Sequence, residues 1–305
     1  MRFSHAAVAS IAASLILVLL PTSESSAQPV PDPTDLDADG LPGVAEPPPG
    51  ATQGPEVFAL QGTARLLVDR THHESFHVGG FTDFLVSQGW TVQSNTSSPI
   101  TDELLDVYDV LIIPPSLYQG PYPEVTPFTP AEQAAVNGFL ASGGGLWLFH
   151  EYRQPATGIN SLSITYGATF RNDMVVDSTH NEGRAFWPTI HTLASHPITQ
   201  GVASYGYYAG SCLQVTAPAI IVGQGDDDAS SSTCLSFPPT LAVYESGLGR
   251  VVFSGDSTPL HPSYYPENLR DEEELLLQNI ANWLAGFPPT ATEATSWGSI
   301  KALYR

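Results

Sequence analysis

Several apolar segments of the sequence end in polar side chains that can take part in acid–base or ligand chemistry. His150 and Glu151 follow the apolar residues 145–149, and Asp256 and Ser257 follow another apolar run that ends near residue 253. A histidine beside a carboxylate can work as a general acid–base pair, and such groups can also bind a divalent metal. We therefore treat His150, Glu151 and Asp256 as catalytic candidates. The wider set of ligand-binding candidates is Asp69, His72, His73, Ser116, His150, Glu151, Asp256 and Ser257.

The alternative for these residues is a structural role, because polar side chains at strand ends commonly cap loops and helices through hydrogen bonds. No His-Glu-x-x-His pattern or similar helical spacing is present, so the sequence does not single out a transition-metal site at these positions. Four aromatic residues also carry two interpretations, as a sugar-stacking surface or as core residues. They are Trp187, Tyr205, Tyr207 and Tyr208.

A second chemical pattern lies near the amino terminus, in residues 35–46. Carboxylates stand at the first, third and fifth positions, glycine at the sixth and glutamate at the twelfth, which is the ligand spacing of an EF-hand calcium loop. The predicted ligands are Asp35, Asp37, Asp39, the Leu41 carbonyl and Glu46. The loop resembles the short calcium repeats of thrombospondin type 3 kind found in exported bacterial proteins. It departs from them in occurring once, and the competing interpretation is an acidic spacer.

Residues 1–27 have the features of a secretory signal: Arg2, an apolar run from residue 6 to 20, and small residues before a cleavage point at Ala27. We therefore expect a secreted, periplasmic or cell-surface protein without a membrane span in its mature form. Export and an even cysteine count favour a disulfide between Cys212 and Cys234, with two buried thiols as the alternative. The formal net charge of −21 makes nucleic acid an unsuitable partner.

Composition and periodicity predict a single α/β domain over residues 64–287. Residues 28–63 are rich in proline and acidic residues and poor in large apolar side chains, so we expect a disordered linker before the domain. After the domain, residues 288–305 are expected to form a proline- and threonine-containing linker and a C-terminal tail. Within the domain, short apolar segments alternate with helical segments, which predicts a mainly parallel, flavodoxin-like sheet flanked by helices. The elements expected are strands at 65–69, 90–93, 109–114, 145–149, 174–176, 186–190, 213–215 and 220–222, a hairpin at 240–255, a polar loop at 225–233, and helices at 79–88, 100–107, 130–141, 158–166 and 272–285.

The order of these segments resembles the class I glutamine amidotransferase-like superfamily. The similarity lies in a strand ending at Asp69, a strand ending in Pro114 and Pro115, the glycine-led strand 145–149, and residues 196–201 and 247–257. Within the superfamily it resembles the noncatalytic GIFT-type branch, with trehalose-utilisation-type proteins as cousins. The resemblance implies a cysteine nucleophile on the turn after residue 149, but His150, Glu151 and Tyr152 stand there instead.

Three functions stay open from the sequence. The favoured one is a non-enzymatic exported module that binds a ligand or partner, such as a carbohydrate, at the carboxyl edge of the sheet. The second is a hydrolase of carbohydrates, esters or amides that uses strand-end histidine and carboxylate side chains, with or without a metal. The third is a structural cell-surface protein, and the only cofactor expected is calcium at residues 35–46.

Overall fold

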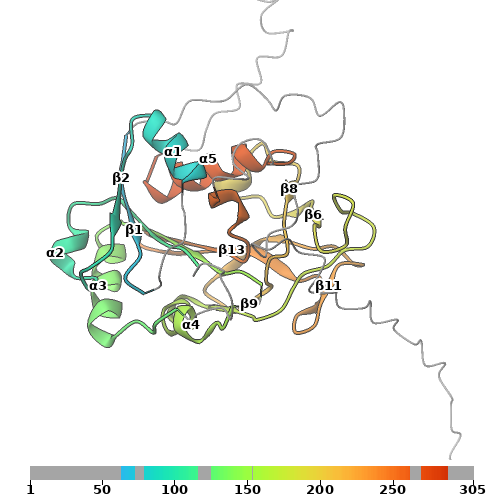
Figure 1. The fold of residues 1–305 in the computed structure, drawn as a ribbon, viewed down its shortest axis with the longest axis horizontal. Coiled ribbons are helices and arrows are strands. Elements are labelled where there is room, and N and C mark those ends of the chain that lie inside the picture. Colours follow the sequence, from blue (N-terminus) through green and yellow to red (C-terminus); the bar gives the residue numbers. More distant parts are fainter. Residues whose placement is uncertain (1–62, 73–78, 116–124, 153, 262–268, 288–305) are drawn as a thin grey trace, which may run out of the picture. The chain divides into compact units, whose positions relative to one another are not determined.

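The computed structural model describes residues 63–72, 79–115, 125–152, 154–261 and 269–287 (Figure 1). The signal peptide, the calcium loop and the tail predicted from the sequence lie outside these residues. Among the described helices, none has the length and the apolar character that a membrane span requires.

The described residues are organised around an eight-stranded sheet with the order β2-β1-β3-β4-β14-β13-β10-β7. The first five strands are parallel to one another, and the last three continue the sheet in antiparallel pairings. The bounds are β1 Arg65–Asp69, β2 Thr91–Asn95, β3 Val110–Ile113, β4 Gly145–Phe149, β7 Thr192–Leu193, β10 Ile220–Gln224, β13 Pro239–Ser246 and β14 Gly249–Ser254. The predicted α/β, flavodoxin-like fold class is confirmed.

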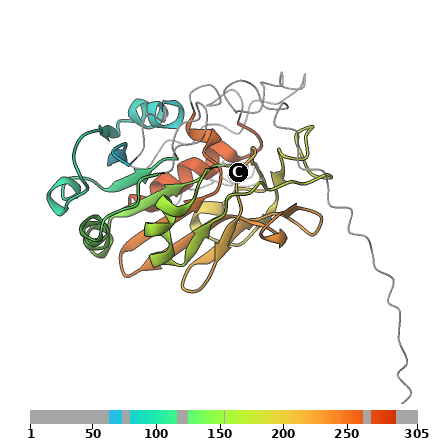
Figure 2. The same cartoon turned by 60° about the horizontal axis from the view of Figure 1, so that its bottom comes forward.

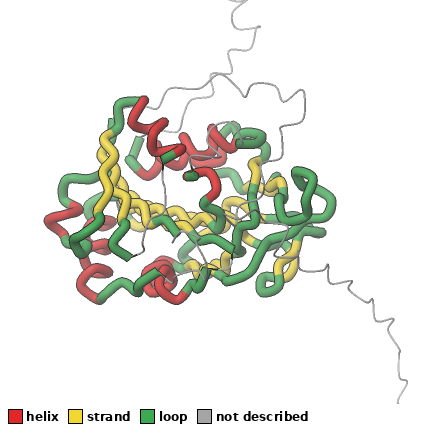
Figure 3. Tube along the Cα trace, viewed as in Figure 1, coloured by secondary structure: helices red, strands yellow, loops and turns green. Residues whose placement is uncertain are grey.

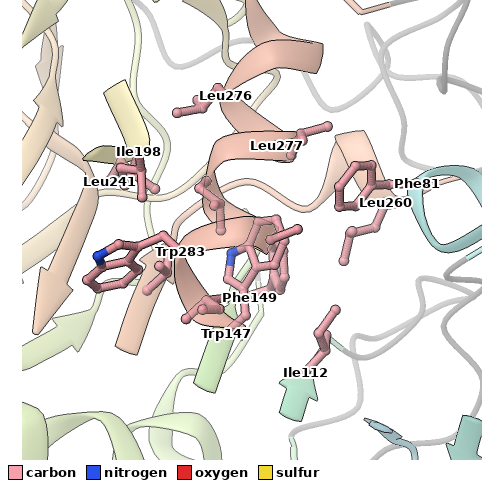
Figure 4. Close-up of a cluster of buried hydrophobic side chains, with 14 of the residues drawn as sticks. Phe81, Ile112, Trp147, Phe149, Ile198, Leu241, Leu260, Leu276, Leu277 and Trp283 are labelled. Atoms are coloured by element: carbon pink, nitrogen blue, oxygen red, sulfur yellow. The ribbon is translucent and has the colours of Figure 1, made fainter. Parts of the chain in front are cut away.

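Helices cover both faces of the parallel part of the sheet (Figures 1 and 2). Within the described residues the α-helices are α1 Gly80–Ser87, α2 Asp102–Leu105, α3 Pro130–Ala141, α4 Thr157–Ser163 and α5 Glu273–Leu284. Side chains alternate along each strand, so Trp147 and Phe149 pack with α1 and α5, whereas Leu146 and Leu148 pack with α3 and α4. Figure 4 shows Trp147 and Phe149 on the side of the sheet that α5 covers, with Leu276, Leu277 and Trp283 projecting from that helix.

The start of α3 illustrates how sequence fixes the position of a helix. Thr129 accepts a hydrogen bond from the Glu132 amide and Glu132 accepts one from the Thr129 amide, which is a capping box, and Pro130 occupies the first turn. The helix ends before Gly143, whose φ of +103° suits glycine. The chain then enters β4, where Gly145 lies so close to the Leu284 carbonyl of α5 that a Cβ would overlap it.

The region between β4 and β13 departs most from the sequence predictions, and loops dominate it (Figure 3). The predicted strand at 174–176 is wrong, because only Val176 forms an isolated bridge, to Ser230. The predicted strand at 186–190 is reduced to β6 Thr189–Ile190, and the predicted loop at 225–233 contains β11 Ser230–Ser231. The remaining short strands are β5 Ala168–Phe170, β8 Tyr205–Gly206, β9 Leu213–Val215 and β12 Leu235–Ser236, and single 3₁₀ turns occur at η2 Ile164–Tyr166, η3 Pro197–Thr199 and η4 Thr258–Leu260.

A disulfide and one buried carboxylate hold this region together. Cys212 and Cys234 form the expected disulfide, with their Cα atoms 6.4 Å apart. Asp173 is 3% exposed and accepts hydrogen bonds from the Cys212 amide at 3.1 Å and from the amide and hydroxyl of Thr233. A covalent bond and a carboxylate therefore join the same two segments, where long regular strands are absent from the described residues.

Candidate functional site

The carboxyl ends of the parallel strands bring the predicted residues to one edge of the sheet. Asp69 ends β1 and pairs in register with Asn95 at the end of β2. His150 directly follows β4, and its amide donates to the Ser254 carbonyl at the end of β14. In open α/β sheets this edge is where ligands usually bind. Since β3 lies between β1 and β4, the polar side chains form two clusters, one on each side of β3.

The first cluster, which we call the Asp69 cluster, consists of Asp69, Thr71, His72, Asn95 and Glu132. His72 Nδ1 lies 2.6 Å from Asp69 Oδ2, and His72 Nε2 lies 3.3 Å from Glu132 Oε1. Thr71 Oγ1 and Asn95 Nδ2 donate to Asp69 Oδ1 at 2.7 and 3.3 Å. The Phe128 ring stacks on the imidazole with the ring centroids 3.9 Å apart.

Charges in the Asp69 cluster compensate one another. Burial alone would lower the pKa of His72, but the hydrogen bond and charge of Asp69, with Glu132, raise it above its ordinary value. Burial alone would raise the pKa values of Asp69 and Glu132, but both are lowered: that of Asp69 by His72 and Thr71, and that of Glu132 by hydrogen bonds from Thr129 and by the charge of His72. An imidazole with a carboxylate at each nitrogen is a doubly donating cation, so the cluster is a buried ion triad that joins β1, β2 and α3.

His150 is buried and has its hydrogen-bonding capacity used inside the protein. It is 1% exposed, its Nδ1 lies 2.8 Å from Ser211 Oγ, and its Nε2 lies 3.1 Å from the Gln154 carbonyl oxygen. Burial lowers its pKa to about 4, against the carbonyl of Gln154 and the charge of Asp173. The imidazole is therefore neutral near pH 7, and it does not hydrogen-bond the adjacent Glu151, whose oxygens contact other groups.

The second cluster, which we call the Glu151 cluster, consists of Glu151, Asp256 and Ser257. Glu151 Oε2 accepts from the amide and hydroxyl of Ser257 at 3.2 and 2.9 Å, and Oε1 accepts from the Tyr152 amide at 2.8 Å. Asp256 accepts from the Tyr208 and Thr258 amides, both at 2.7 Å. Among the described residues, no arginine, lysine or histidine forms an ion pair with either carboxylate.

Without a cation beside them, the carboxyl groups of the Glu151 cluster bind protons more readily than exposed carboxyl groups do. Burial raises the pKa of Asp256 to about 6, against the lowering effect of the two amides. Burial and the charge of Asp256 raise the pKa of Glu151 well above its ordinary value. Asp256 is 5% exposed, whereas Glu151 is only partly buried. Glu151 is thus a carboxyl group that can present a proton near neutral pH at the edge of the sheet.

A cavity of about 30 Å³ extends from Asp256 toward α5. Its lining includes Glu273, Tyr205 and Thr240 together with core side chains. Glu273 is 1% exposed, and its Oε1 has no hydrogen-bond partner among the described residues. Burial and the charge of Asp256 raise the pKa of Glu273 well above its ordinary value. The volume suits one or two water molecules rather than a ligand.

The structure places the other sequence candidates as follows. His73 and Ser116 lie outside the described residues. Asp69 and His72 belong to one cluster, and Glu151, Asp256 and Ser257 to the other. The idea of a sugar-stacking surface is wrong for the four aromatic residues, because they are at most 6% exposed: Trp187, Tyr205, Tyr207 and Tyr208.

Sequence reasoning missed the partners that hold these residues. Glu132 is not among the sequence candidates, although Thr129 followed three residues later by glutamate is the sequence sign of a capping box. Ser211 and Asn95 carry no such sign, because nothing local indicates that they will lie against His150 and Asp69.

Comparisons with known proteins agree with the architecture. No protein-family model matches the chain, and no curated protein matches it significantly. Among solved structures, the mmIFT52 N-terminal domain is similar with a TM-score of 0.59 and 22% identity, over 72% of this chain and 97% of that one. A thua-like protein from Bacteroides uniformis has a TM-score of 0.47 and 17% identity, over 74% of this chain and 94% of that one. A glutamine amidotransferase from Thermotoga maritima has a TM-score of 0.45 and 15% identity, over 74% and 99%.

At these identities the similarity shows the fold and not the activity. The strand order, the helices on both faces and the polar carboxyl edge are those expected from the sequence. The described domain thus shares its fold with the mmIFT52 N-terminal domain.

Proposed function

We propose that this protein is an exported module that binds a ligand or partner at the carboxyl edge of its sheet and does not hydrolyse amides. The observation that carries the proposal is the residue after β4. Where the resemblance implies a cysteine nucleophile, the chain has His150, which is 1% exposed and held at both ring nitrogens. A neutral, buried imidazole without a free nitrogen has no means to activate a nucleophile.

Glu151 is the group we propose for binding, and the buried Ser257 holds its carboxyl group in place through the hydroxyl. Glu151 is partly exposed, and its raised pKa makes it a hydrogen-bond donor as well as an acceptor near neutral pH. A ligand rich in hydroxyl or carbonyl groups, such as a carbohydrate, matches that capacity. The neighbouring cavity of about 30 Å³ is too small for such a ligand, so binding would use the outer surface of this edge.

A direct test of the enzyme alternatives is turnover of glutamine, p-nitrophenyl acetate and p-nitrophenyl glycosides by the purified full chain, with and without added zinc. We expect no turnover above buffer. Turnover that is lost in both Glu151→Gln and Asp256→Asn would replace the binding module with the hydrolase.

A glycan array tests the binding proposal. The full chain and Glu151→Gln are compared, with Glu245→Gln as the matched control, because Glu245 is 59% exposed at the other end of the sheet. We expect at least one glycan to bind the wild-type chain and the control about tenfold more tightly than Glu151→Gln, the effect of one buried polar contact. Equal binding by all three, or none, argues against a carbohydrate at this edge.

We further propose that residues 35–46 bind calcium, which rests on the spacing alone because the loop lies outside the described residues. Calorimetric titration of the full chain with calcium should give a binding event that Asp37→Ala removes. Equal heats from both chains, or no heat at millimolar calcium, would reject calcium binding. Detection of the mature chain outside the cytoplasm, with its amino terminus at residue 28, is the corresponding test of export.

A further inference from the structure

Two histidines and three aspartates from separate segments meet near the point where β10 ends and β7 begins. Asp226 Oδ2 lies 2.8 Å from His180 Nδ1 and 3.1 Å from His191 Nε2. Asp177 Oδ2 and Asp228 Oδ1 lie 3.9 and 4.0 Å from the same His180 nitrogen. We call these five residues the His180 cluster.

Backbone pairing, rather than chance contact of surface side chains, brings the segments together. Gln224 at the end of β10 pairs with Thr192 in β7, which sets His191 beside the loop that carries Asp226. Val176 and Ser230 exchange two backbone hydrogen bonds of 2.8 Å, which set residues 177–180 against the other end of that loop. The Cys212–Cys234 disulfide then anchors the segment that follows.

Each carboxylate of the cluster is held by one oxygen and presents the other toward the histidines. Asp177 Oδ1 accepts from the Thr179 and His180 amides, both at 2.8 Å. Asp226 Oδ1 accepts from the Asp228 and Ala229 amides at 3.3 and 3.2 Å. Asp228 Oδ2 accepts from the Thr179 hydroxyl. Outer contacts of this kind orient the ligands of a metal ion before it binds.

The orientation of the His191 ring also favours a cation in this cluster. Its Nδ1 lies 3.3 Å from the Thr189 carbonyl oxygen, a geometry in which Nδ1 carries the proton. In the neutral ring the lone pair then lies on Nε2, which faces Asp226 Oδ2. A nitrogen lone pair and a carboxylate oxygen about 3 Å apart repel unless a cation or a proton lies between them.

We propose that the His180 cluster is a binding site for a divalent transition metal, with zinc as the expected ion and His180, His191 and Asp226 as its first ligands. The candidate ligand atoms of these three residues lie within 4.8 Å of one another. Zinc bonds of 2.0–2.1 Å place tetrahedral ligands about 3.4 Å apart, so small side-chain movements complete the site. Asp177 or Asp228 can supply a fourth ligand, since both lie within reach of His180.

The histidines of the cluster are accessible to an ion from solvent, whereas Asp177 is buried beneath them. His180 and His191 are 48% and 40% exposed, Asp226 is 13% exposed, and Asp177 is 2% exposed. Bound zinc would link three loop segments that the fold joins by few regular strands. Stabilisation of the folded chain by zinc follows from binding to the folded state alone.

Titration of the purified full chain with zinc, in excess calcium, tests the proposal. We expect one event with a stoichiometry of one that Asp226→Asn weakens by more than about 100-fold, since losing a ligand exceeds the 10- to 100-fold cost of losing an outer contact. The matched control is Asp227→Asn, which removes the same charge from an exposed neighbour with no recorded contact in the cluster. The control should bind zinc as the wild-type chain does.

Cobalt gives a second readout that does not depend on one variant. Cobalt in a site of two imidazoles and carboxylates gives visible absorption, which His191→Gln should abolish and Thr179→Val should weaken by about tenfold in affinity. If Asp226→Asn does not fold by circular dichroism, the exposed His191→Gln decides in its place. Equal zinc affinity of the wild-type chain, Asp226→Asn and His191→Gln, or no binding by any of them, overturns the proposal.

Discussion

The two clusters at the carboxyl edge of the sheet each contain one aspartate and one glutamate, but only the Asp69 cluster has a histidine between them. In the Asp69 cluster, one histidine lies between two carboxylates, and all three groups are ionised in ways that support one another. In the Glu151 cluster, two carboxyl groups share a buried region with amides and hydroxyls and have no cation among the described residues. The first arrangement links β1, β2 and α3, and the second raises the pKa values of Glu151 and Asp256 at the edge of the sheet.

The difference separates positions that stabilise the fold from positions that can meet a ligand. A buried pair that satisfies its charges internally is a structural contact, and removing one member leaves the other uncompensated. A partly exposed carboxyl group with a raised pKa can donate a hydrogen bond to a ligand, and the fold itself does not require that hydrogen bond. By this criterion Glu151, and not His72 or His150, is the functional candidate of the edge.

The largest expected effect is the loss of Asp69. Asp69→Ala leaves His72 and Glu132 without the third member of the triad, and we expect the free energy of unfolding to fall by about 3–5 kcal/mol. Chemical denaturation at pH 7 measures it. The control Asp106→Ala removes an exposed carboxylate after α2 and should change stability by less than about 0.5 kcal/mol. A loss below 1 kcal/mol for Asp69→Ala would show that the triad contributes little.

The second effect is acid sensitivity that originates at His150. Its pKa is about 4 when folded and 6.5 in its ordinary state, so the unfolded chain binds the proton first as the pH falls. The free energy of unfolding is therefore unaffected by His150 protonation above pH 6.5 and falls as the pH drops toward 4. The total decrease is about 3 kcal/mol, at 1.36 kcal/mol per pKa unit. Denaturation curves at several pH values should show this slope in the wild-type chain and lack it in His150→Gln. Parallel pH profiles of the two chains would contradict the prediction.

The smallest effect has the opposite sign and belongs to the Glu151 cluster. Raised carboxyl pKa values make the folded chain the better proton binder, so the contribution of Glu151 is present at low pH and is lost as the pH rises. Glu151→Gln removes that loss but gives up one hydrogen-bond acceptor, worth about 1 kcal/mol. We expect the variant to be less stable than the wild type at pH 4.5 and equal or more stable at pH 8. Thermal melts at both pH values decide, and a variant that is weaker by the same amount at each pH speaks against protonated carboxyl groups.

The sequence was sufficient for the parts of the fold that depend on local signals. Thr129 as an N-cap followed by Pro130, the glycines before β4 and the runs of apolar residues predicted α3, β4 and the hairpin of β13 and β14 to within one or two residues. An even cysteine count together with a predicted signal sequence was sufficient to predict the disulfide. The parallel order also brought Asp69, His150 and Asp256 to one edge, as expected.

Pairings between segments that are distant in the chain could not be predicted from the sequence. Residues 174–176 have the composition of a strand, but they find only a single bridge partner, so composition alone predicted wrongly. His180, His191 and Asp226 have no regular spacing, and only the pairings of β10 with β7 and of Val176 with Ser230 bring them together. His150 and Glu151 are neighbours in sequence, yet successive residues at a strand end face opposite sides, so the predicted acid–base pair does not form a hydrogen bond.

The position of β14 in the sheet has a consequence for how the chain is made. This strand lies between β4 and β13, near the middle of the sheet, but it comes from residues 249–254, and α5, which covers one face, follows at Glu273–Leu284. A chain emerging from the ribosome therefore lacks a central strand and most of one layer until nearly all of the domain has been synthesised. Native contacts of this long range form late, so the domain completes its fold only after most of its chain has been made, which suits the export that we propose.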